Sequence, residues 1–376
     1  MSRWLPLLLI LVVFAGCREL GVLPDHAEPY TLVASRDPGL KTLDQLLPVL
    51  ARQRVVYVGE THTRVGHHRL QLKIIEGLWR QGVDLAIGME AFQQPFQKWL
   101  DAWVAGRIDE QTLLEKTQWY ERWRFDWRLY RPILRFAREH RIPVVALNVP
   151  RELTDQVSEK GLAGLDAQAR ARLPREIDRS DQAYRRRLHE VFNRHRGEEK
   201  GFERFLDVQY TWDEGMAEAV ARYLKTHPDK TMVVLAGAGH IAWGSGIPNR
   251  VARRLPGIAQ AIVLPADRGE RPEEADYLVA VEQISLPPRA LIGVTIEPAP
   301  GGLQVYGVTP GSGAEKAGLK KGDLITAIDG RPVDSYTAVR MALADHRPGD
   351  RVTLTLRRNG REMNRELELM GSPHGG

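Results

Sequence analysis

Two apolar runs in this chain of 376 residues end in the same glycine–histidine spacing. Residues 55–58 lead into Gly59-Glu60-Thr61-His62, and residues 231–236 lead into Gly237-Ala238-Gly239-His240. An imidazole can bind a metal ion or move a proton near neutral pH, and a neighbouring carboxylate can act as a base or a further ligand. The repeated Gly-x-x-His spacing therefore makes His62, His240 and Glu60 the first candidates for a functional site.

Two further apolar runs also end in a polar side chain. Residues 84–89 lead to Glu90, and residues 143–147 lead to Asn148. Short runs of this composition predict buried strands, and residues 65–81 show the helical spacing expected after the first of them. In open α/β sheets, ligands bind beyond the carboxyl ends of the strands. If the four strands are parallel neighbours, their exits bring five side chains to one rim: Glu60, His62, Glu90, Asn148 and His240.

A structural explanation exists for each of these side chains taken alone. A single histidine after a strand is more often hydrogen-bonded for structural reasons, and an acidic residue there is commonly a helix N-cap partner. Four polar exits together are harder to explain in this way. The joint pattern favours a functional site.

The order of the predicted elements indicates two domains. Strands alternate with helices over residues 42–286, which predicts an α/β domain with a mainly parallel sheet flanked by helices. After Pro287-Pro288 the sequence changes to short strands, glycines and one helix. We therefore expect a second, small β-rich domain over residues 287–370.

An aromatic stretch, residues 119–130, lies between the second and third of the candidate strands. It contains Trp119, Trp123 and Trp127 together with several arginines. Aromatic and arginine side chains suit a flat apolar ligand with anionic groups. The same rings could instead pack one helix onto the sheet, and the sequence leaves both readings open.

Composition and charge exclude some partners. The chain is 43% hydrophobic and 27% charged, which is typical of a globular protein. The net charge is +5, and the one arginine cluster, residues 185–187, fits a solvated helix face. Because no basic run is interleaved with exposed aromatics, we expect no nucleic-acid partner.

The first residues predict a targeting segment. Arg3 precedes an apolar run over residues 5–15, and the run ends in Phe14-Ala15-Gly16-Cys17 with the chain's one cysteine. This ending resembles a bacterial lipobox, with Phe14 where leucine is preferred. The resemblance implies a signal peptide over residues 1–16, a lipid on Cys17 and a lipidated tether over residues 17–41.

The same resemblance implies a location. Arg18, and not an aspartate, follows the cysteine. We expect a protein of the bacterial cell envelope that is lipid-anchored at the outer membrane and faces the periplasm. A simple secretory signal with an incidental cysteine is the alternative.

The β-rich segment resembles a bacterial-type PDZ domain across residues 288–368. The resemblance is carried by Ala317-Gly318-Leu319-x-x-Gly322-Asp323-Leu324-Ile325 and by Gly349-Asp350-Arg351-Val352. It implies that Leu291, Ile292, Gly293 and Val294 form the loop that binds the C-terminal carboxylate of a partner protein. The adjoining strand then pairs with the peptide against the helix over residues 336–344. A groove filled by the chain itself is the alternative.

The α/β domain resembles the ChaN-type haem-binding lipoproteins, which belong to a wider group with the Tiki and TraB proteins and the erythromycin esterases. The resemblance covers residues 42–285. It is carried by the two Gly-x-x-His motifs, Glu60, Glu90 and Asn148-x-Pro150-Arg151, and by two further stretches, residues 160–165 and Gln209-x-x-Trp212-Asp213-x-x-Met216-Ala217.

The resemblance implies an envelope lipoprotein that binds haem, in iron uptake or haem handling, with a PDZ module for a protein partner. Such a protein is a binding protein rather than an enzyme. Haem iron needs a His, Tyr, Met or Cys ligand in a dry, partly aromatic pocket. The donors available are His62, His67, His68, Tyr184, Tyr210 and His240. We expect the cofactor to contact Glu60, His62, Glu90, Asn148, Arg151, Tyr210 and His240.

A hydrolase, either a protease or an esterase, is the alternative function. In that case Glu60 would be the general base, with His62, Glu90 and His240 as ligands or polarising groups. Such a hydrolase would either hold a divalent metal ion on His62 and His240 in place of haem, or use these side chains as base and acid without a metal. A third possibility is a scaffold whose PDZ domain carries the function.

Overall fold

The computed structural model describes residues 30–194, 201–266 and 271–372. The expected signal peptide, the lipidation site Cys17 and the first part of the tether lie outside the described residues. Within those ranges, none of the helices combines the length and the apolar character needed to cross a bilayer.

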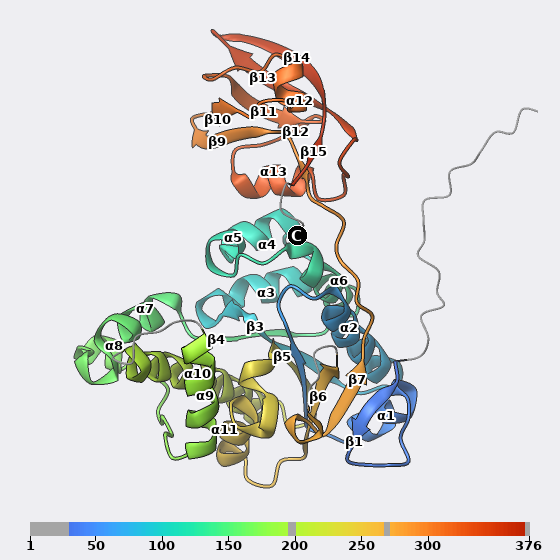
Figure 1. Cartoon of the computed structure of the whole chain (residues 1–376), viewed down its shortest axis with the longest axis vertical. Coiled ribbons are helices and arrows are strands. Elements are labelled where there is room, and N and C mark those ends of the chain that lie inside the picture. Colours follow the sequence, from blue (N-terminus) through green and yellow to red (C-terminus); the bar gives the residue numbers. More distant parts are fainter. Residues whose placement is uncertain (1–29, 195–200, 267–270, 373–376) are drawn as a thin grey trace, which may run out of the picture.

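A seven-stranded sheet organises the first domain (Figure 1). Its strands lie in the order β1-β7-β6-β2-β5-β3-β4, and every neighbouring pair is parallel except β1 with β7. Their bounds are β1 Leu32–Ser35, β2 Val55–Glu60, β3 Leu85–Gln93, β4 Val144–Asn148, β5 Thr231–Gly237, β6 Gln260–Ala266 and β7 Tyr277–Ala280. The mainly parallel sheet expected from the sequence is confirmed.

Helices cover both faces of this sheet because alternate strand residues point to opposite sides. Val56 and Val58 pack into one apolar core, and Val55 and Tyr57 pack into the other. The helices on the side of the first core are α1 Leu43–Leu50, α2 Val65–Arg80, α3 Gln97–Val104, α4 Glu110–Lys116, α5 Trp119–Arg122 and α6 Trp127–Glu139. The second core is covered by α10 Phe202–Thr226 and α11 Ile247–Arg254.

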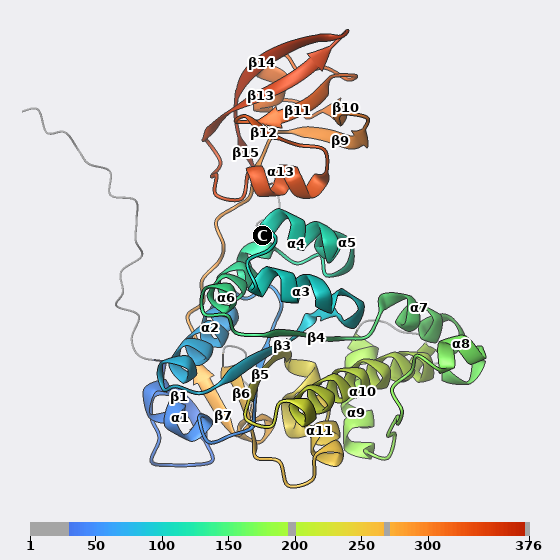
Figure 2. The same ribbon diagram turned by 180° about the vertical axis from the view of Figure 1, so that it is seen from behind.

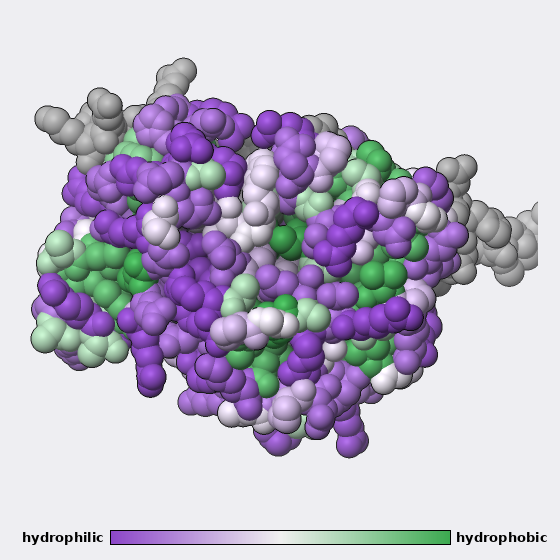
Figure 3. Space-filling model, turned by 90° about the horizontal axis from the view of Figure 1, so that it is seen from below, coloured by the Kyte–Doolittle hydropathy of each residue, from purple (hydrophilic) through white to green (hydrophobic). Residues whose placement is uncertain are grey.

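Smaller elements surround the long helix α10. They are α7 Arg151–Lys160, α8 Ala167–Arg170 and α9 Gln182–Arg194. Short 3-10 turns also occur, and their bounds are η1 Gln94–Phe96, η2 Leu162–Gly164, η4 Ala238–His240, η5 Ala242–Gly244 and η6 Pro272–Glu274. The face of this domain that points away from the second domain is mostly hydrophilic, with separate apolar patches (Figure 3).

The expected tether of residues 17–41 is wrong for its last part. Residues 32–35 form β1, which pairs antiparallel with β7 at the edge of the sheet. Arg36 adds an ion pair with Asp276, with 2.9 Å between Nη1 and Oδ1. Strand β1 was not predicted because it lies at the edge of the sheet, where a strand needs no long apolar run. Its residues Leu32 and Ala34 are only partly buried. Any tether therefore ends before Leu32.

The second domain has its own apolar core and a sheet in the order β14-β13-β11-β10-β9. Its strands are β8 Ala290–Leu291, β9 Val294–Ala299, β10 Gly302–Val308, β11 Leu324–Ile328, β12 Arg331–Pro332, β13 Arg351–Arg358, β14 Arg361–Glu368 and β15 Met370–Gly371. The helices are α12 Gly313–Lys316 and α13 Tyr336–Ala342. In both views of the molecule α13 faces the first domain, above α4 and α5 (Figures 1 and 2).

The loop between β8 and β9 requires its glycine. Gly293 has a φ of 87°, in the left-handed region. A Cβ atom at this position would lie 2.4 Å from Cβ of Ser312. The predicted carboxylate-binding loop, residues 291–294, is thus a tight turn beside the edge strand β9.

Candidate functional site

The parallel register brings the strand exits together. Glu60 at the end of β2 lies opposite Gly237 at the end of β5, and β5 pairs on its other side with β3, which carries Glu90. Side chains at these exits therefore meet at one edge of the sheet. We call the set Glu60, His62, Glu90, Asp213 and His240 the rim site.

Glu60 is the centre of one half of the rim site. It is 4% exposed, and its Oε1 lies 2.8 Å from Nδ1 of His62. Its Oε2 lies 2.9 Å from Nδ1 of His68, and the Tyr130 hydroxyl donates to Oε1 at 3.0 Å. Burial alone would raise the pKa of Glu60, but the nearby imidazoles of His68 and His62 hold it well below its usual range. Glu60 is therefore a fixed anion.

Asp213 plays the same part for the second histidine. This aspartate of α10 has no exposed surface, and its Oδ1 lies 2.7 Å from Nδ1 of His240. The Tyr184 hydroxyl donates to the other oxygen at 2.6 Å. Burial would lower the pKa of His240, whereas Glu90 and Asp213 raise it to about 9. His240 thus lies between two carboxylates, both of which favour its protonated form.

Glu90 lies between the two halves. Its Oε2 accepts a hydrogen bond from the backbone N–H of Gly237 at 2.7 Å, and its Oε1 lies 3.5 Å from Nε2 of His240. A Cβ atom on Gly237 would lie 3.1 Å from Cε1 of His62 and 3.6 Å from Oε2 of Glu90. Gly237, the first residue of the second motif, thus leaves room for the imidazole of the first.

Aromatic rings cover the first histidine. The ring centroids of Trp123 and Phe125 each lie 4.7 Å from that of His62. Burial would lower the pKa of His62, but Glu60 and Glu90 raise it. The side chain is 27% exposed, so one edge of the imidazole remains accessible.

A cavity of about 420 Å³ borders the second histidine. His240 and Gly239 contribute to its wall beside an apolar set from α9, α10 and η5. Its other lining residues are Tyr184, Arg187, Leu188, Val191, Phe192, Phe205, Gln209 and Trp243. The described wall of the cavity is mostly aromatic and aliphatic, and it includes Arg187, whose guanidinium lies 4.7 Å from the Trp243 ring centroid.

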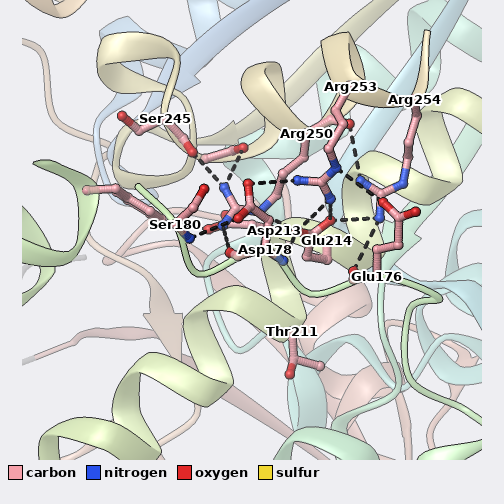
Figure 4. Close-up of polar contacts among 12 residues, drawn as sticks. Glu176, Asp178, Ser180, Thr211, Asp213, Glu214, Ser245, Arg250, Arg253 and Arg254 are labelled. Atoms are coloured by element: carbon pink, nitrogen blue, oxygen red, sulfur yellow. Dashed lines mark hydrogen bonds and ion pairs between the residues drawn. The ribbon is translucent and has the colours of Figure 1, made fainter. Parts of the chain in front are cut away.

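A buried ionic cluster fixes the helices that carry this half of the rim site (Figure 4). Glu214, the residue after Asp213, is fully buried and contacts Arg250 at 3.1 Å and both Arg253 and Arg254 at 2.7 Å. Arg250 also donates to the backbone carbonyl of Ser245 at 2.6 Å. The cluster therefore ties α10 to α11 and to the turn that follows His240.

Three other predicted cofactor contacts, Asn148, Arg151 and Tyr210, have other surroundings in the structure. Asn148 is 9% exposed, and within the described residues its Oδ1 has no hydrogen-bond partner. The Arg151 backbone N–H donates to Gln93, and its guanidinium contacts Asp155 at 3.5 Å. Tyr210 is buried with its ring 6.1 Å from that of Tyr184, behind the cavity wall.

The remaining predicted donors have structural partners. His67 Nδ1 accepts from the backbone N–H of Thr61 at 2.9 Å, which closes the turn after β2. His68 contacts Glu60, as described above. Over residues 30–194, 201–266 and 271–372, no three His, Cys, Asp or Glu side chains are grouped in a way that could hold a metal ion. The alternative of a divalent metal on His62 and His240 is therefore not supported.

Some residues of the site were missed by sequence reasoning. Asp213 and Tyr130 come from helices, whereas the prediction considered strand exits. One signal was available: the buried face of α10 includes Asp213 and Glu214, each fully buried. Carboxylates on an otherwise apolar helical stripe indicate buried partners.

Comparisons with known proteins agree with this architecture. Residues 46–251 match the model of the family described as haem-binding uptake, Tiki superfamily, ChaN, and residues 290–369 match the PDZ domain model. A solved structure described as cofacial haem binding to ChaN of Campylobacter jejuni is 16% identical, with a TM-score of 0.57, over 68% of this chain and 98% of that chain. This likeness shows the fold.

Two curated relatives match parts of the chain. The periplasmic pH-dependent serine endoprotease DegQ of Escherichia coli is 32% identical over 37% of this chain and 28% of its own length. RETICULATA-RELATED 5, a chloroplastic protein of Arabidopsis thaliana, is 25% identical over 57% of this chain and 31% of its own length. The chain thus spans less than a third of either relative.

Proposed function

This chain belongs to the ChaN family of haem-binding uptake proteins in the Tiki superfamily, and on that premise we propose that its first domain binds haem beside His240. The observation that carries the proposal is an imidazole held by a buried carboxylate at the edge of an aromatic cavity. Asp213 contacts Nδ1 of His240, and the cavity measures about 420 Å³.

The residues present fit a haem group. An imidazole that ligates iron typically has its other ring nitrogen bonded to a carboxylate or carbonyl, which fixes the orientation of the ring. Asp213 supplies that partner, and Tyr184 holds Asp213 in turn. Phe192, Phe205 and Trp243 supply apolar wall, as a porphyrin requires.

Charge also suits the ligand. Arg187, an arginine of the cavity wall, would pair with a propionate carboxylate. Bound haem would supply a redox-active iron, whether as cargo or as cofactor. The contribution of the chain is to orient His240 and to exclude water from the aromatic wall.

A haemin titration of the full-length protein tests this proposal. We expect a saturable shift of the Soret band, and at least tenfold weaker binding in His240→Ala. His227→Ala is the matched control, since His227 is exposed at the end of α10 and stacks on Tyr223 away from the cavity. No saturable shift, or equal affinity in the two variants, would contradict haem binding at His240.

The cellular setting is part of the same proposal. The lipobox-like segment ending in Cys17 supports a lipid-anchored protein of the bacterial envelope, placed to take part in iron uptake or haem handling. The PDZ domain, whose family model matches residues 290–369, would bind the C-terminus of a partner protein.

A metal-free hydrolase is a second candidate function. It is favoured by one observation: two imidazole–carboxylate pairs, Glu60–His62 and Asp213–His240, face a third carboxylate, Glu90. Such pairs can act as general acids and bases. Hydrolysis of p-nitrophenyl acetate that is lost in His62→Gln would support it, and a rate equal to that of buffer would exclude this ester chemistry.

A further inference from the structure

The segment over residues 119–126, which we call the aromatic segment, touches the PDZ domain at both ends and the rim site in its middle. It comprises α5 and the turn before α6. Gln118 before it and Arg124 within it have positive φ values of 53° and 70°. A four-residue helix between such turns makes few internal hydrogen bonds, so its position depends on its neighbours.

The first end of the aromatic segment packs on α13. The ring of Tyr120 lies 5.9 Å from that of Tyr336, measured between centroids. The guanidinium of Arg340 lies 5.2 Å from the Tyr120 centroid and 5.3 Å from the Tyr336 centroid. One arginine of α13 is thus in contact with both rings.

The second end is tied to the strand that leads into the carboxylate-binding loop. Arg289 Nε lies 2.8 Å from Oδ2 of Asp126, and Arg289 stands two residues before Leu291. Burial would raise the pKa of Asp126, but Arg128 and Arg289 hold it at about 2. Arg128 also donates to the backbone carbonyl of Pro287 at 3.0 Å. This end is therefore a stable ionic junction between the domains.

Two further contacts hold the domains in place around the segment. The Ser335 hydroxyl donates to Glu115 of α4 at 2.8 Å. Arg131 of α6 pairs with Asp345 at 2.6 Å. These contacts tie the start of α13 and the turn after it to α4 and α6, the helices on both sides of the aromatic segment.

The middle of the segment forms the wall of His62. Trp123 and Phe125 follow Tyr120 by three and five residues, and both rings contact the imidazole at 4.7 Å. In the PDZ fold, α13 and the edge strand β9 are the two sides of the peptide groove, and the loop over residues 291–294 binds the carboxylate at its end. The segment that covers His62 therefore contacts α13 through Tyr120 and contacts Arg289, just before the loop, through Asp126.

We propose that occupancy of the PDZ groove by a peptide C-terminus is coupled to the rim site through the aromatic segment. The inference rests on the proposed function only in naming haem as the rim ligand. Coupling between two binding sites is reciprocal, so a rim ligand must change the groove as a peptide changes the rim. The physical connection is a contiguous set of packed side chains that either ligand can bias.

The first test needs no ligand. The Cε1 resonance of His62 is recorded by NMR in the full-length protein and in Arg340→Ala, which removes the cation between Tyr120 and Tyr336. We expect the resonance to move in Arg340→Ala and to return in Arg340→Lys. Arg351→Ala is the matched control, because Arg351 is an exposed PDZ arginine paired with Glu366. An unmoved resonance in folded Arg340→Ala overturns the coupling.

The second test uses hydrogen exchange to measure whether a change at the rim site alters the PDZ groove. We expect the exchange rates of residues 291–294 and of α13 to change at least threefold in His62→Ala, and in the wild-type protein on addition of haemin. Unchanged exchange in His62→Ala overturns the coupling. A haemin titration without a Soret shift would instead refute haem binding, and the His62→Ala result would still decide the coupling.

Discussion

Each histidine of the rim site is held through its Nδ1 by a buried carboxylate. Glu60 and Asp213 do this from different elements, one at the end of a strand and one within a helix. The contact fixes the orientation of the ring and leaves Nε2 for chemistry. The cost is a set of buried charges, which must be paired to be tolerated.

This pairing predicts how stability depends on pH in the haem-free protein. The pKa of His240 is about 9 in the folded protein against an ordinary value of 6.5, with Glu90 and Asp213 overcoming the effect of burial. Since the folded state holds the proton more tightly, the stabilisation is fully present below pH 6.5 and is lost as the pH rises toward 9. The loss is at most about 3–4 kcal/mol, at about 1.4 kcal/mol for each unit of pKa.

Urea unfolding at pH 6 and pH 9 measures this loss. We expect Asp213→Asn to be less stable than the wild type at pH 6 and to lose less than half as much stability between the two pH values. Asp155→Asn removes a 59% exposed carboxylate that pairs with Arg151, and should keep the wild-type dependence. Equal slopes in Asp213→Asn and the wild type would show that this pair does not set the pKa of His240.

At the scale of the elements, the rim site depends on how α10 and α11 are held together. Glu214 is fully buried with three arginines around it, and Arg250 extends the contact to the turn after His240. The cluster shown in Figure 4 thus sets the position of Asp213 relative to His240. Its role is to position the histidine.

Removing the charge at the centre of this cluster should destabilise the protein strongly. Glu214→Gln leaves Arg250, itself 2% exposed, without its anionic partner, and we expect a loss of about 3–5 kcal/mol in urea unfolding. Glu366→Gln, which breaks an exposed pair with Arg351, should cost less than about 1 kcal/mol. Similar losses in both variants would mean that the buried cluster contributes no more than a surface pair.

How well each site residue could be predicted from the sequence depends on whether a strand or a helix carries it. Glu60, His62, Glu90 and His240 lie in or just after the carboxyl-terminal parts of strands. Parallel strands end at a shared edge whatever their exact order, so the pattern of apolar runs was sufficient. Asp213 and Tyr130 come from helices whose rotation and register are set by packing between distant segments. The edge strand β1 was missed for a related reason: its partner, β7, lies more than two hundred residues away.

At the scale of the whole molecule, two domains with separate apolar cores are joined by a specific interface. The PDZ domain has a separate core and meets the first domain through α13 and the residues around Arg289. The division at Pro287-Pro288 was visible as a change in composition. The contacts between the domains could not be predicted from the sequence. Arg289, Tyr336 and Arg340 look like ordinary surface residues until their partners on the first domain are known.

Because β1 fastens the chain to the sheet from Leu32 onward, any anchor on Cys17 would be separated from the folded domain by at most 14 residues. An extended chain of this length reaches about 50 Å, so the protein would stay close to the membrane. We expect Cys17→Ser, expressed in a bacterium, to move the protein from the membrane fraction to the soluble fraction. A Ser35→Ala variant, processed through the same leader, is the control that should remain in the membrane fraction. Membrane fractionation of Cys17→Ser equal to that of the control would contradict lipid anchoring and indicate attachment through a protein partner.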